Sequence, residues 1–496
     1  MSYPRTPIGD VWLGIDLGTQ SVRALAVLDD GTVVGSGSAG LASHRDGPRH
    51  EQDPEQWWQA VGTACRHALA DVAPQAVRAV AVDATSGTVL LVDRDGRPLT
   101  PALMYDDTRA ADEVNRVNDV GAAVWEILGY RRMQPSWALP KLLWLIREYA
   151  ALLPEARLAH QNDFINQRLT GHQVPTDLSN ALKTGAQLIT ESWPLDVLDT
   201  LGVPARLMPY LVRSGTTIGA VSASAAIQTR IPAGTAVISG ATDGCAAQLG
   251  AGALRVGSWN SVLGTTLVVK GVTRELVRDP LAVVYSHKSP NGQWLPGGAS
   301  STGAGIISRD YAGRDLAELN HGAAHHEPAA VLAYPLVSRG ERFPFVAPQA
   351  EAFLLGTPQT DAERYAAVLQ GVAFIERLCF DYLDLIGAPV DGDIVLTGGA
   401  TRNEYWNQLR ADVLHRPLTL PTNAEPALGM AVLAASPQRN VADVALEMVR
   451  TSRIIEPRAD AAGRYDETYA RFLAELEGRG WLSGPAATHA RERTKR

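Results

Sequence analysis

Asp16 and the turn that follows it are the first residues whose types and spacing suggest chemistry. The turn consists of Gly18, Thr19, Gln20 and Ser21 and joins two strand-like apolar runs. A turn of small residues exposes backbone N–H groups, and its hydroxyls add donors, so it can bind phosphate oxygens. Asp16 lies near the end of the first run, where its carboxylate could hold Mg²⁺ through water. The same residues also fit an ordinary hairpin in which the aspartate satisfies its own turn, and the turn alone leaves both interpretations open.

A second turn, formed by Gly264, Thr265 and Thr266, repeats this arrangement within GSWNSVLGTTLVVKG. Two turns that carry hydroxyl groups can hold a polyphosphate from opposite sides. We therefore expect both turns to contribute phosphate contacts.

A third turn, in VLTGGATRN, ends a strand and opens a helix. Gly398 and Gly399, followed by Ala400, permit a flat ring or a ribose to approach the backbone closely, and Asn403 could donate a hydrogen bond to it. Glycines at such a turn are also needed wherever the backbone requires a positive φ. The pattern alone therefore fits a nucleotide site and an ordinary turn equally well.

Asp243 lies in SGATDGCAAQLG, after a strand and at the expected start of a helix. The N-terminal end of a helix dipole favours an ionised carboxylate. A carboxylate held there can accept the proton of an alcohol that attacks phosphorus. An aspartate that merely caps the helix would occupy the same position, so the neighbouring residues must decide between the two roles.

The elements that position these residues follow an α/β pattern, because strand-like runs alternate with helix-length segments. Asp-Gly pairs between apolar runs in LDDGTVV and VDRDGRPL predict hairpins. Between them, a helix is predicted with Asp53 as its N-cap and Pro54 at its first position. Trp57, Val61 and Cys65 recur there at helical spacing.

The strand–turn–strand unit GIDLGTQSVRALAVLDDG recurs as GSWNSVLGTTLVVKG, which suggests duplicated halves. The boundary between the halves is expected near GATDGCAAQLGAGALRVG. We predict one domain over residues 8–250, a second over 251–445, and a helical extension over 446–496. Its short, polar and basic end, ATHARERTKR, is predicted to be a frayed tail.

Other familiar motifs are absent or lack their context. Residues 35–40 match G-x-G-x-x-G, but no helix pattern follows them, which argues against a dinucleotide site. The sequence contains no P-loop, no G-x-S-x-G and no H-E-x-x-H. His325 and His326 are adjacent in a polar stretch and fit solvated side chains better than metal ligands.

Composition excludes several classes of protein. The 496 residues are 46% hydrophobic and 20% charged, which excludes a wholly disordered chain. A formal net charge of −8 argues against a general nucleic-acid binder. Cys65, Cys245 and Cys379 form no disulfide or zinc pattern and fit a reducing compartment. No apolar run is long enough to span a membrane, so a soluble cytoplasmic protein is expected.

With these segments assembled, the sequence resembles the FGGY family of carbohydrate kinases over roughly residues 10 to 440. GIDLGTQSVR and GSWNSVLGTTLVV resemble the two phosphate motifs, and SGATDGCAAQLG resembles the segment whose catalytic base maps onto Asp243. VLTGGATRNEYWNQLRADVLHRPL resembles the adenosine-binding segment, and EPALGMAVLA the helix after it. WALPKLLWLIRE, with Lys141 and Trp144, is similar to a family signature. Ala138 and Thr357 depart from the family's two signatures without touching the expected chemistry.

The resemblance implies two actin-like, ribonuclease-H-like α/β domains, with sugar and ATP in a cleft that closes during the reaction. It also implies that Asp243 takes the proton of a sugar hydroxyl, and we expect Mg²⁺ to bridge the phosphates, with Asp16 as its candidate ligand from the position beside the first turn. The expected ATP contacts are the two hydroxyl-bearing turns together with Gly398, Gly399, Ala400 and Asn403.

The expected sugar segments differ from two branches of the family. Glycerol kinases carry Asn-Gln-Arg-Glu-Thr near here, and xylulokinases carry Gln-Met-His-Gly and then Trp-Asn-Asp, whereas this chain has DATSGT and YDD. With GGASSTGAG, these segments look more like a pentulose branch that is ribulokinase-like and xylulokinase-like. In that branch the residues matching Asp16, Thr19 and Asp243 lie against the ketose. The other expected sugar contacts are Thr85, Ser86, Tyr105, Asp107 and Arg109, although Thr85 and Ser86 also fit a loop-capping role.

The leading hypothesis is an ATP-dependent kinase of a ketopentose, with D-ribulose narrowly ahead of D-xylulose. The alternatives are a kinase of another sugar or polyol (L-ribulose, ribitol, erythritol or glycerol) and a non-catalytic sugar-sensing module on the same fold. Asp243 beside a sugar loop favours the kinase, because fold alone does not separate the two classes. The expected partner is the small sugar, with no nucleic acid and no membrane, and a homodimer is left open.

Overall fold

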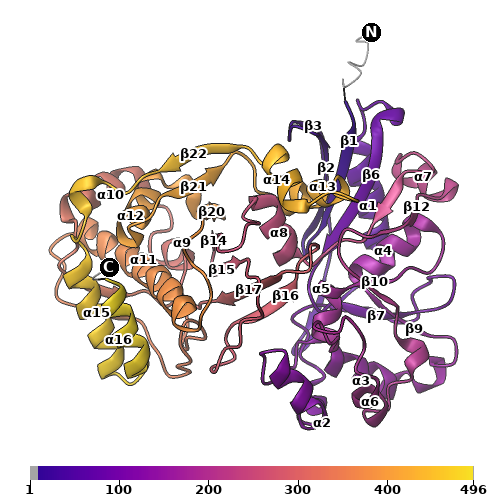
Figure 1. The fold of residues 1–496 in the computed structure, drawn as a ribbon, viewed down its shortest axis with the longest axis horizontal. Coiled ribbons are helices and arrows are strands. Elements are labelled where there is room, and N and C mark those ends of the chain that lie inside the picture. The colour runs from indigo at the N-terminus through magenta and orange to yellow at the C-terminus, as the bar shows by residue number, and fades with distance from the viewer. Residues whose placement is uncertain (1–8, 495–496) are drawn as a thin grey trace. The chain divides into compact units, whose positions relative to one another are not determined.

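The computed structural model describes residues 9–494, which form two compact units (Figure 1). The first unit contains the chain up to Gly252 together with His287–Leu295 and Asn423–Arg450. The second contains Ala253–Ser286, Pro296–Thr422 and the chain from Thr451 onward. Each unit is therefore assembled from separate stretches of sequence.

The first unit is built around a six-stranded sheet. The strand Val11–Leu17 pairs in parallel with Val77–Ala84 on one side and antiparallel with Ser21–Leu28 on the other. Ser21–Leu28 in turn pairs antiparallel with Val33–Gly40. In spatial order the strands are β12 (Thr217–Ala220), β13 (Ala236–Ile238), β6 (Val77–Ala84), β1 (Val11–Leu17), β2 (Ser21–Leu28) and β3 (Val33–Gly40).

The second unit repeats this topology. The run β17-β15-β14-β20-β21-β22 has the same sequence of antiparallel and parallel pairings as β3-β2-β1-β6-β13-β12. The duplication that the sequence suggests is thus present in the fold. The strands are β16 (Tyr285–Lys288), β17 (Trp294–Ala299), β15 (Leu267–Gly271), β14 (Trp259–Leu263), β20 (Ile394–Thr397), β21 (Leu418–Pro421) and β22 (Thr451–Ile455).

Smaller sheets and the helices complete each unit. The five-stranded sheet consists of β4 (His44–Asp46), β5 (Arg49–Gln52), β8 (Ala102–Leu103), β7 (Val89–Val92) and β9 (Arg157–His160), and the two pairs are β10 (Thr176–Asp177) with β11 (Leu211–Val212) and β18 (Leu332–Tyr334) with β19 (Phe353–Leu355). The first unit has α1 (Pro54–Ala68), α2 (Val114–Ile127), α3 (Ala138–Glu148), α4 (Gln161–Thr170), α5 (Leu178–Ala181), α6 (Leu195–Thr200), α7 (Ala223–Thr229), α8 (Asp243–Ala251), α13 (Pro426–Ala434) and α14 (Val441–Met448). The second has α9 (Gly305–Asp310), α10 (Leu316–Ala323), α11 (Asp361–Leu385), α12 (Glu404–Leu414), α15 (Asp466–Gly478) and α16 (Gly484–Arg493).

Helix α1 covers one face of the first sheet, as its sequence signals predict. Asp53 caps the helix and accepts a hydrogen bond from the N–H of Glu55. The glycines of the G-x-G-x-x-G match lie in β3, where they let the helix approach. A Cβ at Gly35 would lie 2.0 Å from a carbonyl oxygen of α1, and one at Gly37 would lie 2.1 Å from another. These glycines therefore serve packing, which confirms that they do not form a dinucleotide loop.

Helix α13 belongs to the first unit although it lies late in the chain (Figure 1). Residues 427–434 are all buried, so this helix needs cover on every side. Its backbone lies directly against β1, because a Cβ at Gly14 would be 1.8 Å from the carbonyl oxygen of Ala427. The sequence-based division into 8–250 and 251–445 places this helix in the other domain and differs here from the compact units.

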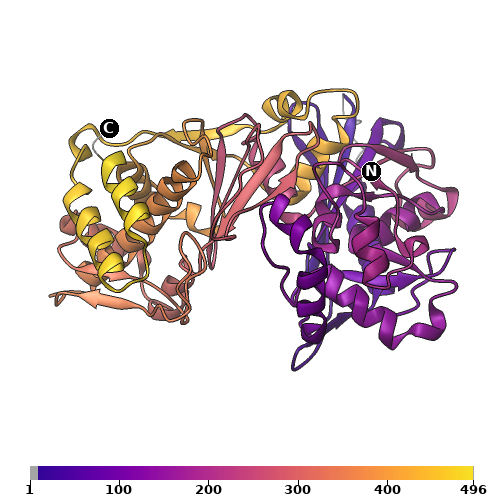
Figure 2. The same cartoon turned by 60° about the horizontal axis from the view of Figure 1, so that its bottom comes forward.

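The C-terminal segment is a helix through Arg493, and the prediction of a frayed tail from ATHARERTKR is wrong for the described part. Ala486, Ala487 and Ala490 form a buried face of α16, and small side chains permit close packing. Figures 1 and 2 show α15 and α16 side by side next to α11. The last two residues lie outside the described range.

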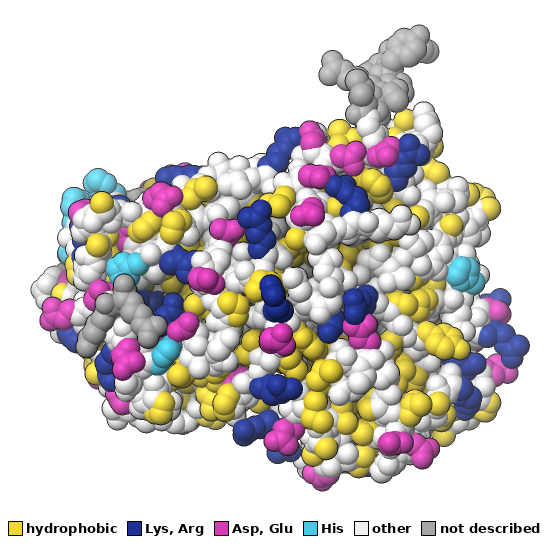
Figure 3. Space-filling view, viewed as in Figure 1, with side chains coloured by type: hydrophobic (Ala, Val, Ile, Leu, Met, Phe, Trp, Pro, Cys, Tyr) yellow, Lys and Arg dark blue, Asp and Glu magenta, His cyan; other side chains and the backbone are white. Residues whose placement is uncertain are grey.

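Charges of both signs are interspersed on the face drawn in Figure 3, where no basic stripe is seen. Within residues 9–494, no helix combines the length and apolar character needed to cross a membrane.

Candidate active site

The carboxyl ends of β1 and β6 bring two aspartates together. These strands are parallel, and their register pairs Asp16 with Asp83. Asp83 is completely buried, and neither of its carboxyl oxygens has a hydrogen-bond donor among the described residues. Burial, followed by the nearby charges of Asp16 and Asp243, raises the pKa of Asp83 well above its usual range. Burial and the neighbouring negative charges thus both favour the protonated form of Asp83.

Asp16 is the charged partner of this pair. Burial raises the pKa of Asp16 to about 6, the hydrogen bond from Asp83 lowers it, and the charge of Asp243 raises it again. Two ionised carboxylates cannot hydrogen-bond to each other, so the hydrogen bond between Asp16 and Asp83 requires a proton shared by the pair. While the pair shares that proton, it carries a single negative charge at the carboxyl ends of β1 and β6.

Asp243 is the first residue of α8, as the sequence predicts. Its Oδ1 accepts a hydrogen bond of 2.7 Å from the N–H of Gly244, and the side chain is partly exposed. The charge of Asp243 raises the pKa of Asp16, of Asp83 and of Tyr105. The three carboxylates therefore form one electrostatic group in the first unit, on residues far apart in sequence.

The turn at residues 18–21 closes with a hydrogen bond of 3.1 Å from the N–H of Gly18 to the carbonyl of Ser21. Gln52 Nε2 donates to the carbonyl of Thr19 at 2.7 Å, which anchors the turn on β5. The Gln20 side chain is exposed. The turn is thus fixed by its backbone, and its side chains are left at the surface of the site.

The segment after β6 is held from several directions. Thr85 Oγ1 lies 2.6 Å from Thr88 Oγ1 and 2.6 Å from Gln161 Oε1, and the N–H of Thr85 also donates to that Gln161 oxygen. Ser86 Oγ, in contrast, is buried and has no hydrogen-bond partner among the described residues. Lys183 Nζ donates to the carbonyl of Ser86. The hydroxyl of Thr85 is thus engaged by Thr88 and by Gln161 of α4, whereas the buried hydroxyl of Ser86 has no partner among the described residues.

Lys141 joins the two segments expected to bind the sugar. Its completely buried Nζ donates to the carbonyl oxygens of Gly87 and Met104, each at 2.7 Å. Burial lowers the pKa of Lys141 to about 7, against the opposing charge of Asp107. This signature lysine therefore fixes the spacing between the segment at 83–88 and the segment at 104–109.

The second of these segments carries a buried ion pair. Asp107 accepts hydrogen bonds from the guanidinium of Arg109, which also donates to Glu51 at 2.6 Å and lies over the ring of Trp144. The Arg109 side chain is only 5% exposed. Tyr105 is 40% exposed, so it is the most accessible of the expected sugar contacts in this segment.

Two residues that the sequence analysis did not assign are placed in this group by the fold. Asp83 pairs with Asp16, and Gln161 contacts Thr85 while its own Nε2 is buried without a partner among the described residues. A charged residue at the end of the apolar strand AVRAVAVDA is the signal that could have found Asp83. Gln161 carries no such signal, because its position depends on how α4 packs.

A cavity of about 600 Å³ lies within the second unit. Its wall contains Gly264 and Thr265 from one predicted turn and Gly399, Ala400 and Asn403 from another. Thr266 and Gly398 do not line it. The fold thus brings two sequence motifs more than a hundred positions apart to one cavity.

A polar corner of this cavity is made by side chains of three helices or their caps. Asn403 caps α12 by accepting from the N–H of Trp406, and its Nδ2 donates to Asn320 Oδ1 at 3.1 Å and to the Tyr365 hydroxyl at 3.3 Å. Tyr365 Oη donates to the same Asn320 oxygen. This corner combines an aromatic ring with amide groups, a lining suited to a heteroaromatic base or a ribose.

The Gly264 turn is held by the segment GGASSTGAG. The N–H of Ala304 donates to the carbonyl of Gly264, and that of Gly305 donates to the carbonyl of Thr265. The buried carboxylate of Glu341 accepts from Ser300 Oγ and from the N–H of Ser301, which orders the segment. GGASSTGAG therefore supports the turn in the second unit and contributes Ala304 and Gly305 to the cavity wall.

The two glycines of the third turn have different roles. Gly398 has a φ of +89°, and a Cβ there would lie 2.6 Å from the carbonyl oxygen of Leu263. Gly399 lines the cavity, and a Cβ there would meet no atom within 4 Å. Gly398 thus permits the positive φ and the close approach to Leu263, and Gly399 leaves the cavity wall free of a side chain.

Gly399→Val should raise the KM for ATP about 10-fold, because filling the cavity wall costs roughly 1–3 kcal/mol when a ligand must fit there. Initial rates at varied ATP would measure this, with Gly478→Val as the control. Gly478 ends α15 and also has open space at its Cβ. An unchanged KM for ATP in Gly399→Val would show that the nucleotide binds elsewhere.

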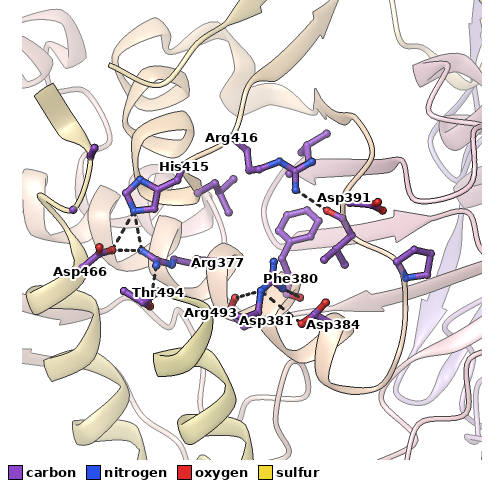
Figure 4. A pocket seen from close by; sticks show the side chains of 16 residues that line it. Arg377, Phe380, Asp381, Asp384, Asp391, His415, Arg416, Asp466, Arg493 and Thr494 are labelled. Carbon is purple, nitrogen blue, oxygen red and sulfur yellow. Dashed lines mark hydrogen bonds and ion pairs between the residues drawn. The ribbon is translucent and has the colours of Figure 1, made fainter. Parts of the chain in front are cut away.

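A larger cavity of about 810 Å³ in the second unit, drawn in Figure 4, has a different character. Arg377 pairs with Asp466 at 3.0 Å, and Arg493 lies 3.5 Å from Asp381. Arg416 donates to backbone carbonyls. None of the predicted site residues lines this cavity, and its arginines are already engaged, so its size alone does not make it the nucleotide site.

The chain is similar to known proteins over most of its length. Residues 11–250 match the N-terminal domain, and residues 259–436 the C-terminal domain, of the FGGY family of carbohydrate kinases. A xylulose kinase of Klebsiella pneumoniae is 29% identical over 493 residues, covering 94% of this chain and 99% of its own. One of Streptomyces rubiginosus is 30% identical over 482 residues, covering 94% and 96%.

Among solved structures, the xylulose kinase of Rhodospirillum rubrum is similar, with a TM-score of 0.83, 27% identity and coverage of 94% of this chain and 98% of its own. The predicted α/β fold of two actin-like domains is therefore confirmed, and an enzyme is favoured over a non-catalytic module. The chain belongs to the FGGY family of carbohydrate kinases and is an ATP-dependent sugar kinase.

Proposed function

We propose that this enzyme transfers the γ-phosphoryl group of ATP to a hydroxyl of a ketopentose, with D-xylulose as the first candidate. The observation that carries the proposal is the group formed by Asp16, Asp83 and Asp243, together with the Ser86 hydroxyl three positions after Asp83, which has no partner among the described residues. Buried polar atoms without partners are costly, and the hydroxyl groups of a sugar would supply hydrogen bonds to them.

Asp243 acts as the general base. Its carboxylate accepts the proton of the sugar hydroxyl while that oxygen forms its bond to phosphorus, and the bond from phosphorus to the bridging oxygen of ADP breaks. Partial exposure leaves the Asp243 carboxylate accessible to a substrate.

Asp16 is the candidate ligand of Mg²⁺. Among residues 9–494 no group of three or more His, Cys, Asp or Glu is arranged around a metal position. Mg²⁺ in phosphoryl transfer is commonly held by one or two carboxylates, phosphate oxygens and water, so the oxygen donors here fit. Bound Mg²⁺ would neutralise charge on the transferred group, and the raised pKa of Asp16 marks a carboxylate that a cation would stabilise.

The cavity in the second unit is the candidate ATP site. Gly264 and Thr265 would bind phosphate oxygens through N–H and hydroxyl groups, and the corner at Asn403 would take the base or ribose.

An intracellular location follows from the use of ATP and fits three free, buried cysteine thiols. A homodimer stays a prediction, which sedimentation of the full chain would test.

The relatives named xylulose kinases support D-xylulose and reverse the narrow lead given to D-ribulose from the sequence. D-ribulose is the second candidate, because ATSG (residues 84–87) replaces the xylulokinase run Gln-Met-His-Gly at the expected sugar contacts. Tyr105 is the most exposed of these contacts, and the buried hydroxyl of Ser86 has no partner among the described residues. Thr85, Asp107 and Arg109, in contrast, are engaged with protein groups.

The preferred ketopentose should be phosphorylated with kcat/KM at least ~10-fold above that of glycerol, a margin of ~1.4 kcal/mol. Glycerol would leave buried polar groups unpaired in a pocket built for more hydroxyls, at a cost of ~1–3 kcal/mol each. ADP release in a coupled assay over D-xylulose, D-ribulose, L-ribulose, ribitol, erythritol and glycerol measures this. Equal efficiencies for glycerol and both D-pentuloses would refute the pentulose assignment and leave the kinase assignment intact.

A further inference from the structure

The residue before Asp243 is held by a side chain from a distant part of the first unit. The N–H of Thr242 donates to Ser179 Oγ with an N···O distance of 2.9 Å. Thr242 and Ser179 are each only 1% exposed. Thr242 is the N-cap of α8, but its own side chain makes no capping hydrogen bond. The start of this helix thus depends on an acceptor supplied by α5.

Ser179 is itself fixed in orientation. Its hydroxyl donates to Asp177 Oδ1 at 2.5 Å, which leaves its lone pairs to face Thr242. The same Asp177 oxygen accepts from the N–H groups of Ser179 and Asn180, and the other oxygen accepts from the side chains of Asn162 and Asn180. A hydroxyl with its proton committed to a carboxylate is a well-defined and strengthened acceptor.

A second anchor holds the same segment from β6. The N–H of Ala84 donates to the carbonyl of Ala241 at 3.2 Å, directly after Asp83 in sequence. Residues 241 and 242 are therefore fixed on one side to the strand that carries Asp83 and on the other to Ser179. These two bonds set where Asp243 lies relative to Asp16 and Asp83.

We propose that Ser179, oriented by Asp177, is a positioning residue that holds Asp243 in the geometry required for proton transfer. Ser179 acts through the backbone of Thr242 and touches neither substrate. The inference rests on the proposed role of Asp243 as the base and adds a residue that acts through it.

Ser179→Ala should lower kcat by roughly 10-fold to 100-fold, because it removes the acceptor of a buried N–H and lets the segment shift. The KM values for sugar and ATP should change by less than about 2-fold, since no binding group is removed. Ser179→Thr, which keeps the hydroxyl, should retain more than about a third of the wild-type kcat. A wild-type kcat in Ser179→Ala would overturn the proposal, as would a Ser179→Thr enzyme as slow as Ser179→Ala.

Ser222→Ala is the matched control for stability. Ser222 caps α7 in the same unit by accepting from the N–H of Ala225 at 3.2 Å, and it has no bond to α8. Both variants should lower the thermal unfolding midpoint to a similar extent, but only Ser179→Ala should lower kcat. If Ser222→Ala lowered kcat equally, the effect would be one of general stability and the proposal would fail.

The double variant with Asp243→Asn separates this inference from the proposed function. A residue that acts only through Asp243 should cause no further loss once Asp243 has been replaced, so the two effects should be strongly non-additive. Fully additive losses would overturn the positioning role while leaving the base in place. A nearly active Asp243→Asn enzyme would instead refute the base itself.

Discussion

Asp243→Asn should nearly abolish sugar-dependent ATP turnover, lowering kcat by roughly 10²–10⁴-fold. Asparagine has the shape of aspartate and can still accept the hydrogen bond from the N–H of Gly244, which holds the side chain in place. It cannot accept a proton from the attacking hydroxyl at neutral pH. The loss should therefore fall on kcat, while ATP binding, measured directly by titration, should stay close to that of the wild type.

The control for this substitution is Asp53→Asn. Asp53 is also an aspartate at a helix start in the first unit, and its carboxylate accepts from the N–H of Glu55. Asparagine caps helices about as well as aspartate, so this variant should keep the wild-type rate. An Asp243→Asn enzyme that kept more than about a third of the wild-type kcat would show that Asp243 is not the general base. The loss of a base that contributes even ~10²-fold would lower kcat much further.

The positions of Asp16 and Asp243 at the ends of their elements could be predicted because the signals are local. An apolar run, a turn of small residues and a second apolar run define β1 and β2, and the helix after Thr242 follows a strand directly. The cap at Asp53 and the strand-to-helix turn at Gly398 are also set by neighbouring residues. Local rules reach such features because their hydrogen bonds close within a few positions.

The chemistry around Asp16 depends on contacts that no local pattern contains. Asp83 meets Asp16 only because β6 pairs in parallel with β1, 67 positions away by the register 16↔83. The engagement of Thr85 by Gln161 depends on the packing of α4. Thr85 and Ser86 are equally good sugar contacts by residue type. Only the fold distinguishes them, because the Thr85 hydroxyl is bound by Gln161 and the Ser86 hydroxyl has no partner among the described residues.

Asp16→Asn is expected to have the other large effect, a fall in kcat of about 10²-fold or more under saturating sugar and ATP. A carboxylate that holds Mg²⁺ near a transferred phosphoryl group stabilises charge by several kcal/mol, and asparagine lacks the charge to do so. The Mg²⁺ concentration that gives half the maximal rate should rise, while binding of metal-free nucleotide should change little. An unchanged Mg²⁺ dependence would reassign Asp16 to the sugar or to structure.

The same substitution should make the folded protein more stable at neutral pH. The pKa of Asp16 is raised from 3.8 to about 6 in the folded state, so the folded state binds this proton more tightly than the unfolded state. Stability from this group is fully present below the unfolded pKa and is lost as the pH rises through about 6, by up to about 3 kcal/mol. Asparagine carries no such charge, and the advantage of Asp16→Asn should therefore grow between pH 4 and pH 7.

Thermal unfolding of both proteins across this pH range measures the difference in stability, in which the titrations of groups remote from Asp16 cancel. Asp30→Asn is a control of opposite sign, because hydrogen bonds from Thr32 lower the pKa of the exposed Asp30. That variant should lose rather than gain relative stability as the pH rises. If the stability of Asp16→Asn relative to the wild type were the same at pH 7 as at pH 4, the ionised Asp16 carboxylate would not destabilise the folded state. A variant that is slower yet more stable would show that the fold tolerates this charge for the sake of the reaction.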